Sequence, residues 1–291
     1  MVCGKVRATV CIPTLDAGPH WKELWSSLEK QTLRPSEVIV LDSSSTDGTA
    51  ELARSCGCQV IDVARADFRH GGTRQQAAEL ARDADVIIYL TQDAILAGAN
   101  ALARLVAAFD DESVGAAYGR QLPKPSSKPI EAHARIFNYP PVSATRSLED
   151  AKTIGFKAIF FSNSFGAYRR AALEKVGGFP TQSNFGEDTV VAARLLQNGW
   201  RIAYVADALA YHSHAYGHVE ELRRYYTIGQ LHGSEPWLVR DFGKTSAEGR
   251  RFVLSEVQYL LTHAPWLVPD AILRTGLKYL AYRFGRYASQ H

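Results

Sequence analysis

The chain has 291 residues, 22% of them charged and 10% aromatic, which is the composition of an ordinary globular protein with a large core. A formal net charge of +3 is too small to indicate a nucleic-acid partner. We expect no signal peptide and no membrane-spanning helix, because the start lacks an apolar run and no apolar segment is long enough. The four cysteines lack zinc-site spacing, so we expect reduced thiols in a cytoplasmic protein.

The first hundred residues alternate between short apolar runs and segments with helical periodicity. Strands are predicted at 8–12, 37–42, 59–63 and 86–91, and helices at 21–28, 49–53 and 73–81. This alternation predicts an α/β fold with a mostly parallel sheet and helices on both faces. In such a sheet, ligands bind beyond the carboxyl ends of the strands.

Polar residues directly follow three of these strands, at Pro13 and Thr14, at Asp42 to Ser44, and at Gln92 and Asp93. Asp42 can accept a hydrogen bond from a base or a ribose, but "STDGT" after it also fits a turn and a helix N-cap. Asp93 at a strand end suits Mg²⁺ or Mn²⁺, which prefer oxygen donors, although Asp also caps helices.

The segment "HGGTRQQA" (70–77) places two glycines immediately before a helix. Backbone N–H groups at a helix start suit a diphosphate, and Arg74 adds a cation. The same two glycines are equally compatible with a loop and a capped helix that bind nothing.

From about residue 121 to 157 the chain is rich in proline and serine, which predicts a long loop that shapes a cleft. Beyond it, 187–199 predicts a helix closed by glycine, and 200–214 predicts a strand followed by a polar turn. The helix starts with Glu187 and Asp188, which the helix dipole stabilises without any function. The functional alternative is a general base that faces the cleft and takes a proton from an attacking hydroxyl.

Two histidines, His212 and His214, follow the last predicted strand. Because they are two residues apart, they point to opposite sides if the strand continues, so one of them can complete a metal site. The alternative is that both are ordinary surface histidines.

The tail from 250 to 287 mixes leucine and aromatic residues with arginine and lysine, and is broken at Pro265 and Pro269. This pattern predicts amphipathic, basic helices. They either cap the main domain or lie on an anionic membrane with their aromatic rings at the headgroup level.

Several motifs occur together in one order: "VCIPTLDAG", "VIVLDSSSTDGT", "YLTQDA" and a block that contains "VGGF", "GEDTVVAARLLQNGW" and "YHSH". This order resembles the GT-A glycosyltransferases of family 2, over about residues 8–235. The segments "DFRHGGTRQQA" and "LTQDA" are also similar to bacterial rhamnosyltransferases, which use dTDP-L-rhamnose. The basic aromatic tail resembles the membrane-associating ends of those enzymes.

The resemblance implies a role for each matching residue. Asp188 is implied as the catalytic base, with Glu187 as its support, and Asp93 with His212 or His214 as the ligands of a weakly held Mg²⁺ or Mn²⁺. The residues implied to bind the nucleotide sugar are Pro13, Thr14, Asp42, Ser44, Arg74, Thr91, Gln92 and Asp93. One departure is Thr91, which stands where the family's DxD motif has its first acid and supplies no charge.

The implied function is an inverting transfer of L-rhamnose from dTDP-L-rhamnose to a glycan or glycolipid acceptor, with the tail on the inner face of the membrane. A UDP-hexose donor and a non-catalytic binding module remain as alternatives. A dinucleotide oxidoreductase is disfavoured, because no GxGxxG follows the first strand. We expect a GT-A domain at 1–235, with a nucleotide-sugar half (1–115) and an acceptor half (116–235), and a helical segment at 236–291.

Overall fold

The computed structural model describes residues 6–213, 216–243 and 246–290. The chain forms two compact units. The first unit comprises residues 1–121, 141–148 and 161–212, and the second unit comprises residues 122–140, 149–160 and 213–291.

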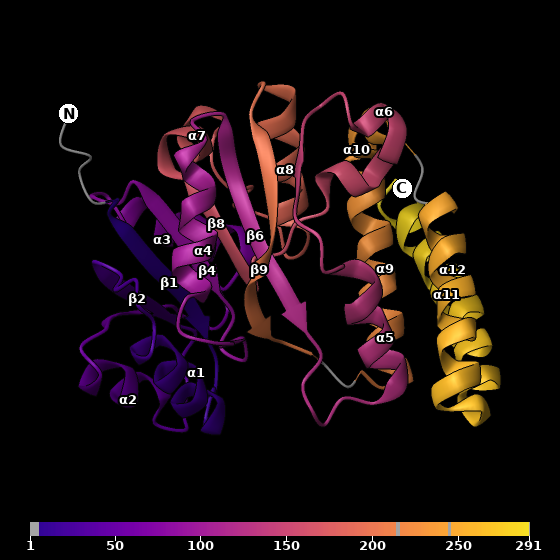
Figure 1. Ribbon diagram of the computed structural model, residues 1–291, viewed down its shortest axis with the longest axis horizontal. Helices are drawn as coiled ribbons and strands as arrows, with labels where there is room; N and C mark the ends of the chain where they lie inside the picture. Colours follow the sequence, from indigo (N-terminus) through magenta and orange to yellow (C-terminus); the bar gives the residue numbers. More distant parts are fainter. Residues whose placement is uncertain (1–5, 214–215, 244–245, 291) are drawn as a thin grey trace. The chain divides into compact units, whose positions relative to one another are not determined.

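The first unit is built on a sheet with helices on both faces (Figure 1). The described strands form one nine-stranded sheet in the order β3-β2-β1-β4-β8-β6-β9-β5, with β7 paired to β9. The strands are β1 (Ala8–Thr14), β2 (Glu37–Asp42), β3 (Gln59–Asp62), β4 (Val86–Leu90), β5 (Ile95–Leu96), β6 (Val114–Leu122), β7 (Ala144–Arg146), β8 (Phe165–Arg169) and β9 (Arg201–Tyr211).

The prediction of parallel strands is confirmed for β1 to β4, which pair in parallel. The later strands make the sheet mixed, since β8 is antiparallel to β4 and β6, and β9 is antiparallel to β5 and β7. All five residues of β4 are buried, as a strand covered on both faces requires.

Six helices among the described residues of the first unit pack on this sheet. They are α1 (Pro19–Glu29), α2 (Thr49–Ser55), α3 (His70–Leu80), α4 (Ala101–Ala107), α7 (Arg170–Lys175) and α8 (Glu187–Gln197). The apolar spacing predicted for α1 forms its buried face, with Trp21, Leu24 and Leu28 in the core.

The register of the strands brings distant residues to one edge of the sheet. Thr14 pairs with Asp42 at the carboxyl ends of β1 and β2. Leu90 at the end of β4 pairs with Phe165 at the start of β8. Because β8 is antiparallel, the residues just before Phe165 lie at the carboxyl end of β4.

The stretch 121–157 is not the irregular loop that its prolines predict. It contains α5 (Pro129–Asn138), β7 and α6 (Ala151–Ile154), followed by a 3₁₀ turn at Gly155–Ile159. Pro129 stands in the first turn of α5, where a missing N–H costs nothing, and Glu131 accepts a hydrogen bond from the backbone N–H of Lys128. The proline that suggests a loop therefore starts a helix.

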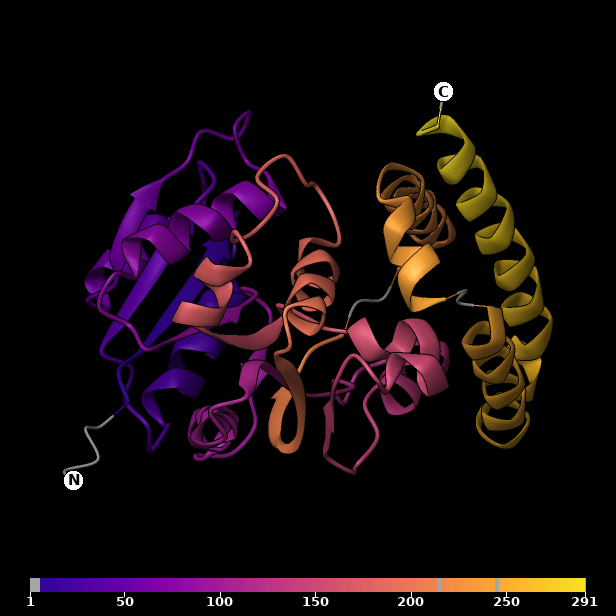
Figure 2. The same cartoon turned by 90° about the horizontal axis from the view of Figure 1, so that it is seen from above.

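The second unit is helical. Besides α5 and α6 it contains α9 (His218–Ser234), α10 (Pro236–Phe242), α11 (Ser246–His263) and α12 (Val268–Ala288). Figure 2 shows α9, in orange, beside α12, in yellow.

Glycines allow α9 and α12 to approach closely. A Cβ atom on Gly229 would lie 2.2 Å from the Tyr282 carbonyl oxygen, and one on Gly285 would lie 1.9 Å from the Tyr226 carbonyl oxygen. Through this packing α9 lies in the same compact unit as the tail helix α12.

Candidate active site

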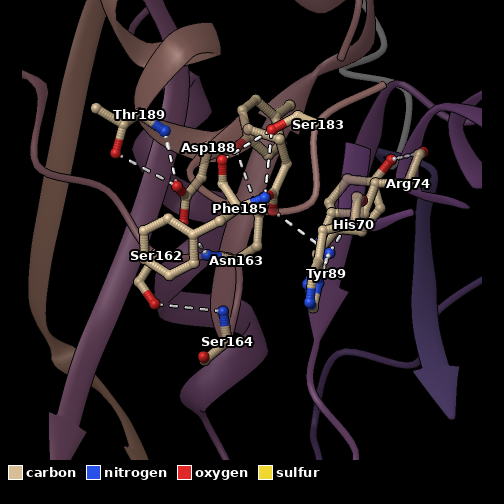
Figure 3. A network of polar contacts seen from close by, with 12 residues as sticks. His70, Arg74, Tyr89, Ser162, Asn163, Ser164, Ser183, Phe185, Asp188 and Thr189 are labelled. Carbon is tan, nitrogen blue, oxygen red and sulfur yellow. Dashed lines mark hydrogen bonds and ion pairs between the residues drawn. The ribbon is translucent and has the colours of Figure 1, made fainter. Parts of the chain in front are cut away.

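Three successive residues, Ser162, Asn163 and Ser164, lie at the carboxyl end of β4. The backbone N–H of Thr91, the residue after β4, donates to the Ser164 carbonyl oxygen over 3.4 Å. Figure 3 shows this triplet between the start of α8 and the neighbouring side chains. We call residues 162–164 the SNS triplet, because Asp188, Glu187 and Gln121 each contact one of its residues.

Asp188 lies on one side of the SNS triplet, in the first turn of α8. Its Oδ2 faces the backbone N–H of Asn163 at 3.4 Å, and its Oδ1 accepts from the backbone N–H of Thr189 at 2.7 Å (Figure 3). The side chain is only partly buried. Asp188 is thus held by backbone donors and remains accessible to another molecule, as a general base requires.

Glu187 points to the opposite side and is buried. Its Oε1 accepts from the Asn163 side-chain amide at 2.9 Å and lies 3.3 Å from Nη1 of Arg74. The Asn163 amide is oriented in turn by the Tyr168 hydroxyl, which donates to its Oδ1 at 2.8 Å. Glu187 is thus anchored between Asn163 and Arg74, and its role as a support for Asp188 stays a prediction.

The two neighbouring carboxyl groups differ in their affinity for protons. Burial, and next the negative charge of Glu187, raise the pKa of Asp188 to about 7. Burial also raises the pKa of Glu187, but Arg74, His70 and the Asn163 amide outweigh it, so the net pKa of Glu187 is lowered. Environments that separate two carboxyl pKa values in this way are typical of a general base and its anionic support.

A carboxylate and an imidazole meet on the other side of the SNS triplet. Asp93 Oδ1 lies 3.4 Å from Nε2 of His212, and both side chains are largely buried. Nδ1 of His212 lies 2.9 Å from Oε1 of Gln121, whose amide nitrogen donates to the Ser162 hydroxyl at 2.8 Å. Because Gln121 presents its oxygen to Nδ1, this nitrogen donates, and Nε2 is the ring nitrogen that faces Asp93.

This arrangement fits a divalent cation. A metal-binding histidine commonly donates its other N–H to an oriented acceptor, as His212 does to Gln121. A carboxylate and an imidazole together suit Mn²⁺, and a carboxylate suits Mg²⁺. Within the described part of the chain, no third His, Cys, Asp or Glu joins the pair. His214, the other predicted ligand, lies outside the described residues.

The predicted nucleotide residues after β1 and β2 form a tight turn. Asp42 is buried and accepts from the Thr14 hydroxyl at 2.9 Å and from the Ser45 hydroxyl and backbone N–H at 2.6 and 2.8 Å. Ser44 has a positive φ of 61° and donates to the Val63 carbonyl oxygen. Asp42 therefore fixes the turn at the carboxyl end of β2, next to Pro13 and Thr14 at the end of β1.

The residues after β4 have different partners. Gln92 bonds both amide ends to the backbone of Leu15, at 2.8 and 3.0 Å, so it joins the ends of β4 and β1. The Thr91 hydroxyl is buried and has no hydrogen-bond partner among the described residues. A buried hydroxyl of this kind is a candidate for binding a ligand.

Arg74, which is predicted to contact the diphosphate, is directed toward other residues of the protein instead. Its guanidinium is buried, pairs with Glu187 and contacts the His70 backbone carbonyl at 3.1 Å. The two glycines do not form a phosphate cradle either, because Gly71 donates its N–H to the Ser183 carbonyl oxygen at 2.9 Å. A Cβ atom on Gly71 would lie 1.9 Å from the Pro180 carbonyl oxygen, so the glycine permits close backbone packing.

The family model described as Glycosyl transferase family 2 matches residues 9–177 of this chain. The chain belongs to glycosyl transferase family 2. Among its curated relatives, the O-antigen chain rhamnosyltransferase WbaN of Salmonella anatum is 44% identical over 96% of this chain and 89% of the relative. The O-antigen chain rhamnosyltransferase RfbN of Salmonella typhimurium is also 44% identical, over 97% of this chain and 90% of the relative.

Solved structures support the GT-A fold of this glycosyltransferase. A mannosyltransferase from Pyrobaculum calidifontis, in complex with GDP-Man and Mn²⁺, aligns with a TM-score of 0.62 and 20% identity, over 99% of this chain and 88% of that one. TarS of S. aureus in complex with UDP-GlcNAc aligns with a TM-score of 0.58 and 17% identity, over 97% and 91% of the two chains. At these identities the likeness concerns the fold alone.

Gln121 and the SNS triplet are site residues of this family 2 glycosyltransferase that are not among those predicted from the sequence. Gln121 is buried and orients His212, while the triplet contacts both halves of the site. The sequence feature that could have indicated the SNS triplet is "FFSNSFG", in which a short polar segment lies between aromatic residues directly before a strand. Because the loop carries no titratable side chain, residue type alone does not point to it.

Proposed function

We propose that the protein is an inverting glycosyltransferase that transfers L-rhamnose from dTDP-L-rhamnose to a hydroxyl group of a lipid-linked surface glycan. The observation that carries this proposal is the SNS triplet, which contacts Asp188 through Asn163 and, through Ser162, contacts Gln121, the partner of His212. The 44% identity to two O-antigen chain rhamnosyltransferases supports rhamnose as the transferred sugar.

In the proposed reaction, the Asp188 carboxylate accepts the proton of the acceptor hydroxyl group. The hydroxyl oxygen forms a bond to the anomeric carbon from the face opposite the nucleotide. The bond between that carbon and the diphosphate oxygen breaks, and its electron pair leaves with dTDP. A single displacement of this kind inverts the anomeric centre, so a β-linked donor gives an α-linked product.

Residues of the first unit hold the donor in this proposal. Pro13, Thr14, Asp42 and Ser44 form the edge that receives the nucleotide, and the Thr91 hydroxyl donates to the ribose or the sugar. Asp93 and His212 would hold Mg²⁺ or Mn²⁺, which would neutralise negative charge on the diphosphate. Gln92 keeps the ends of β1 and β4 in place, and Glu187 supports Asp188.

The experiment that tests the proposal is a comparison of donors with purified protein and Mn²⁺. dTDP-L-rhamnose, UDP-glucose and UDP-galactose are each supplied with a range of lipid-linked glycan acceptors, and product is detected by mass spectrometry. We expect product with dTDP-L-rhamnose, and an inverted linkage by NMR. Product only with a UDP-hexose would overturn the donor assignment. Absence of product with every donor tested would favour a non-catalytic binding module.

We also propose that the second unit contacts the anionic inner face of the cell membrane, where the acceptor lipid lies. None of the described helices combines the length and hydrophobicity that a bilayer span requires. Instead, α9 and α12 form an apolar groove of about 660 Å³. It is lined by Leu222, Arg223, Tyr226, Thr227, Leu277, Leu280, Ala281 and Phe284.

The charges around this groove favour an anionic lipid surface. Arg223 and Arg283 are exposed, on α9 and α12, and Phe284 beside the latter is 66% exposed. Glu221, the nearby acid on α9, is paired with Arg274 and Lys278 and adds no free negative charge. Exposed aromatic and basic side chains together are typical of helices that lie at a lipid headgroup layer.

Serine replacements test the membrane contact without removing a helix that the fold needs. We expect Leu280→Ser/Phe284→Ser to bind vesicles that contain phosphatidylglycerol at least about tenfold more weakly than wild type, because two apolar side chains no longer insert. The matched control is Val142→Ser, at an exposed apolar residue of the first unit. Co-sedimentation at low salt measures the binding, and a wild-type protein that stays in the supernatant would contradict the proposal.

A further inference from the structure

Helix α3 contacts the segment before α8 at several successive points. Besides the hydrogen bond from Gly71 to Ser183, the side-chain oxygen of Gln75 accepts from the backbone N–H of Phe179 at 2.9 Å. A Cβ atom on Gly72 would lie 2.9 Å from the Thr181 carbonyl oxygen. The start of α3 therefore fixes the backbone that leads into the catalytic helix.

The last of these contacts is the ion pair between Arg74 and Glu187. Only 5% of the Arg74 side chain and 6% of the Glu187 side chain are exposed. Arg74 is itself held in place, because its backbone carbonyl oxygen accepts from the Tyr89 hydroxyl at 2.8 Å (Figure 3). Because a lone buried charge is costly, each member of this pair depends on the other.

We propose that Arg74 is a positioning residue for Asp188: its buried ion pair with Glu187 fixes the start of α8 and keeps a carboxylate anion beside the catalytic base. The inference rests on the proposed function, in which Asp188 is the base. It gives the "HGGTR" motif a part in proton transfer instead of a contact with the diphosphate.

Among the charged and titratable groups near the two acids, Glu187 is the anion that faces Asp188. Arg74 and His70 come from α3, Tyr168 from β8 and Tyr89 from β4. Burial lowers the pKa of His70 and raises the pKa values of both tyrosines well above their usual range, so these three groups stay neutral near pH 7. Removal of the Glu187 charge should therefore lower the pKa of Asp188.

The test compares Glu187→Gln, Arg74→Met, the double variant Arg74→Met/Glu187→Gln and the charge-conserving Arg74→Lys. The proton affinity of Asp188 is measured in each by carboxyl ¹³C NMR, which needs no turnover, and the pH profile of kcat is recorded in parallel. The matched control is Arg82→Met, at an exposed arginine just beyond α3. The double variant removes both buried charges together, so it keeps the test valid if a single variant fails to fold.

We expect the titration of Asp188, and the acid limb of kcat, to move to lower pH by at least about one unit in Glu187→Gln and to move to higher pH in Arg74→Met, because Glu187 raises and Arg74 lowers the pKa of Asp188. The double variant should move to lower pH by less than Glu187→Gln, because Glu187 has the larger of the two opposite effects. In Glu187→Gln the maximal rate should fall roughly three- to tenfold, because the base is weaker. In Arg74→Lys the Asp188 titration should lie close to its wild-type pH, and in Arg82→Met it should be unchanged. If the double variant folds cooperatively and its Asp188 titrates at the wild-type pH, the inference is overturned. If the wild-type protein transfers no rhamnose, only the proposed function is overturned.

Discussion

Replacement of Asp188 by Asn should lower the rate of sugar transfer by about 10²–10⁴-fold while the protein folds and binds dTDP as the wild type does. Asparagine has the same shape, and its side-chain oxygen can still accept the backbone N–H of Thr189, which lies 2.7 Å from Oδ1 in the wild type. What it lacks is the ability to take a proton. The loss should therefore appear in kcat, with little change in the affinity for the nucleotide.

Rapid-quench measurement of a single turnover, together with calorimetry of dTDP binding, separates these two quantities. Asp110→Asn is the matched control, because this acid is exposed and lies at the end of a 3₁₀ turn after α4. Transfer by Asp188→Asn at a rate close to that of the wild type would remove Asp188 from the reaction. A loss of both transfer and dTDP binding would instead indicate a structural role.

The pH profile gives the same variant a second readout. Because burial and Glu187 raise the pKa of Asp188 to about 7, the base is protonated and inactive below that pH and ionised above it. Wild-type kcat should therefore rise with pH through about 7. The residual rate of Asp188→Asn should lack this limb, since the group that titrates is gone.

The sequence predicts this site best where local periodicity and topology decide. β2 ends at Asp42 as predicted, β1 extends two residues beyond its predicted end to Thr14, and β4 ends one residue before its predicted end, at Leu90. Parallel pairing brings these ends to one edge. The start of α8 at Glu187 follows from its apolar spacing and its first-turn acids. These features depend on residues close together in the chain, so one sequence is sufficient to find them.

The sequence is a poorer guide where a contact between distant segments decides. Gly71 before a helix fits a phosphate loop or close backbone packing, and only the approach of Pro180 shows which is present. The partner of Arg74 depends in the same way on how α3 meets α8. The SNS triplet reaches the end of β4 only because β8 runs antiparallel to it, and such a crossover leaves no local signal.

Replacement of Asp93 by Asn should lower transfer by about 10²–10³-fold, because the proposed cation site loses its one carboxylate. Binding of Mn²⁺ in the presence of dTDP should weaken in parallel, and electron paramagnetic resonance measures it without turnover. Gln121→Leu should weaken Mn²⁺ binding by about 10–100-fold, because His212 then has no acceptor for its Nδ1 proton. Asp62→Asn is the control, since this acid at the end of β3 is 76% exposed.

These two variants distinguish a metal site from an ordinary ion pair. If Asp93 and His212 served only to hold β9 against the end of β4, both variants would destabilise the fold, and Mn²⁺ would bind equally well to every protein. If they hold the cation, the loss in Asp93→Asn should be partly reversed by raising the Mn²⁺ concentration, because the imidazole and the donor diphosphate remain as ligands. Transfer at the wild-type rate in the presence of a strong chelator would contradict the metal site, whatever the variants show. The position of His212 Nε2, 3.4 Å from Asp93 Oδ1 with its other nitrogen bonded to Gln121, favours the cation site over a purely structural role.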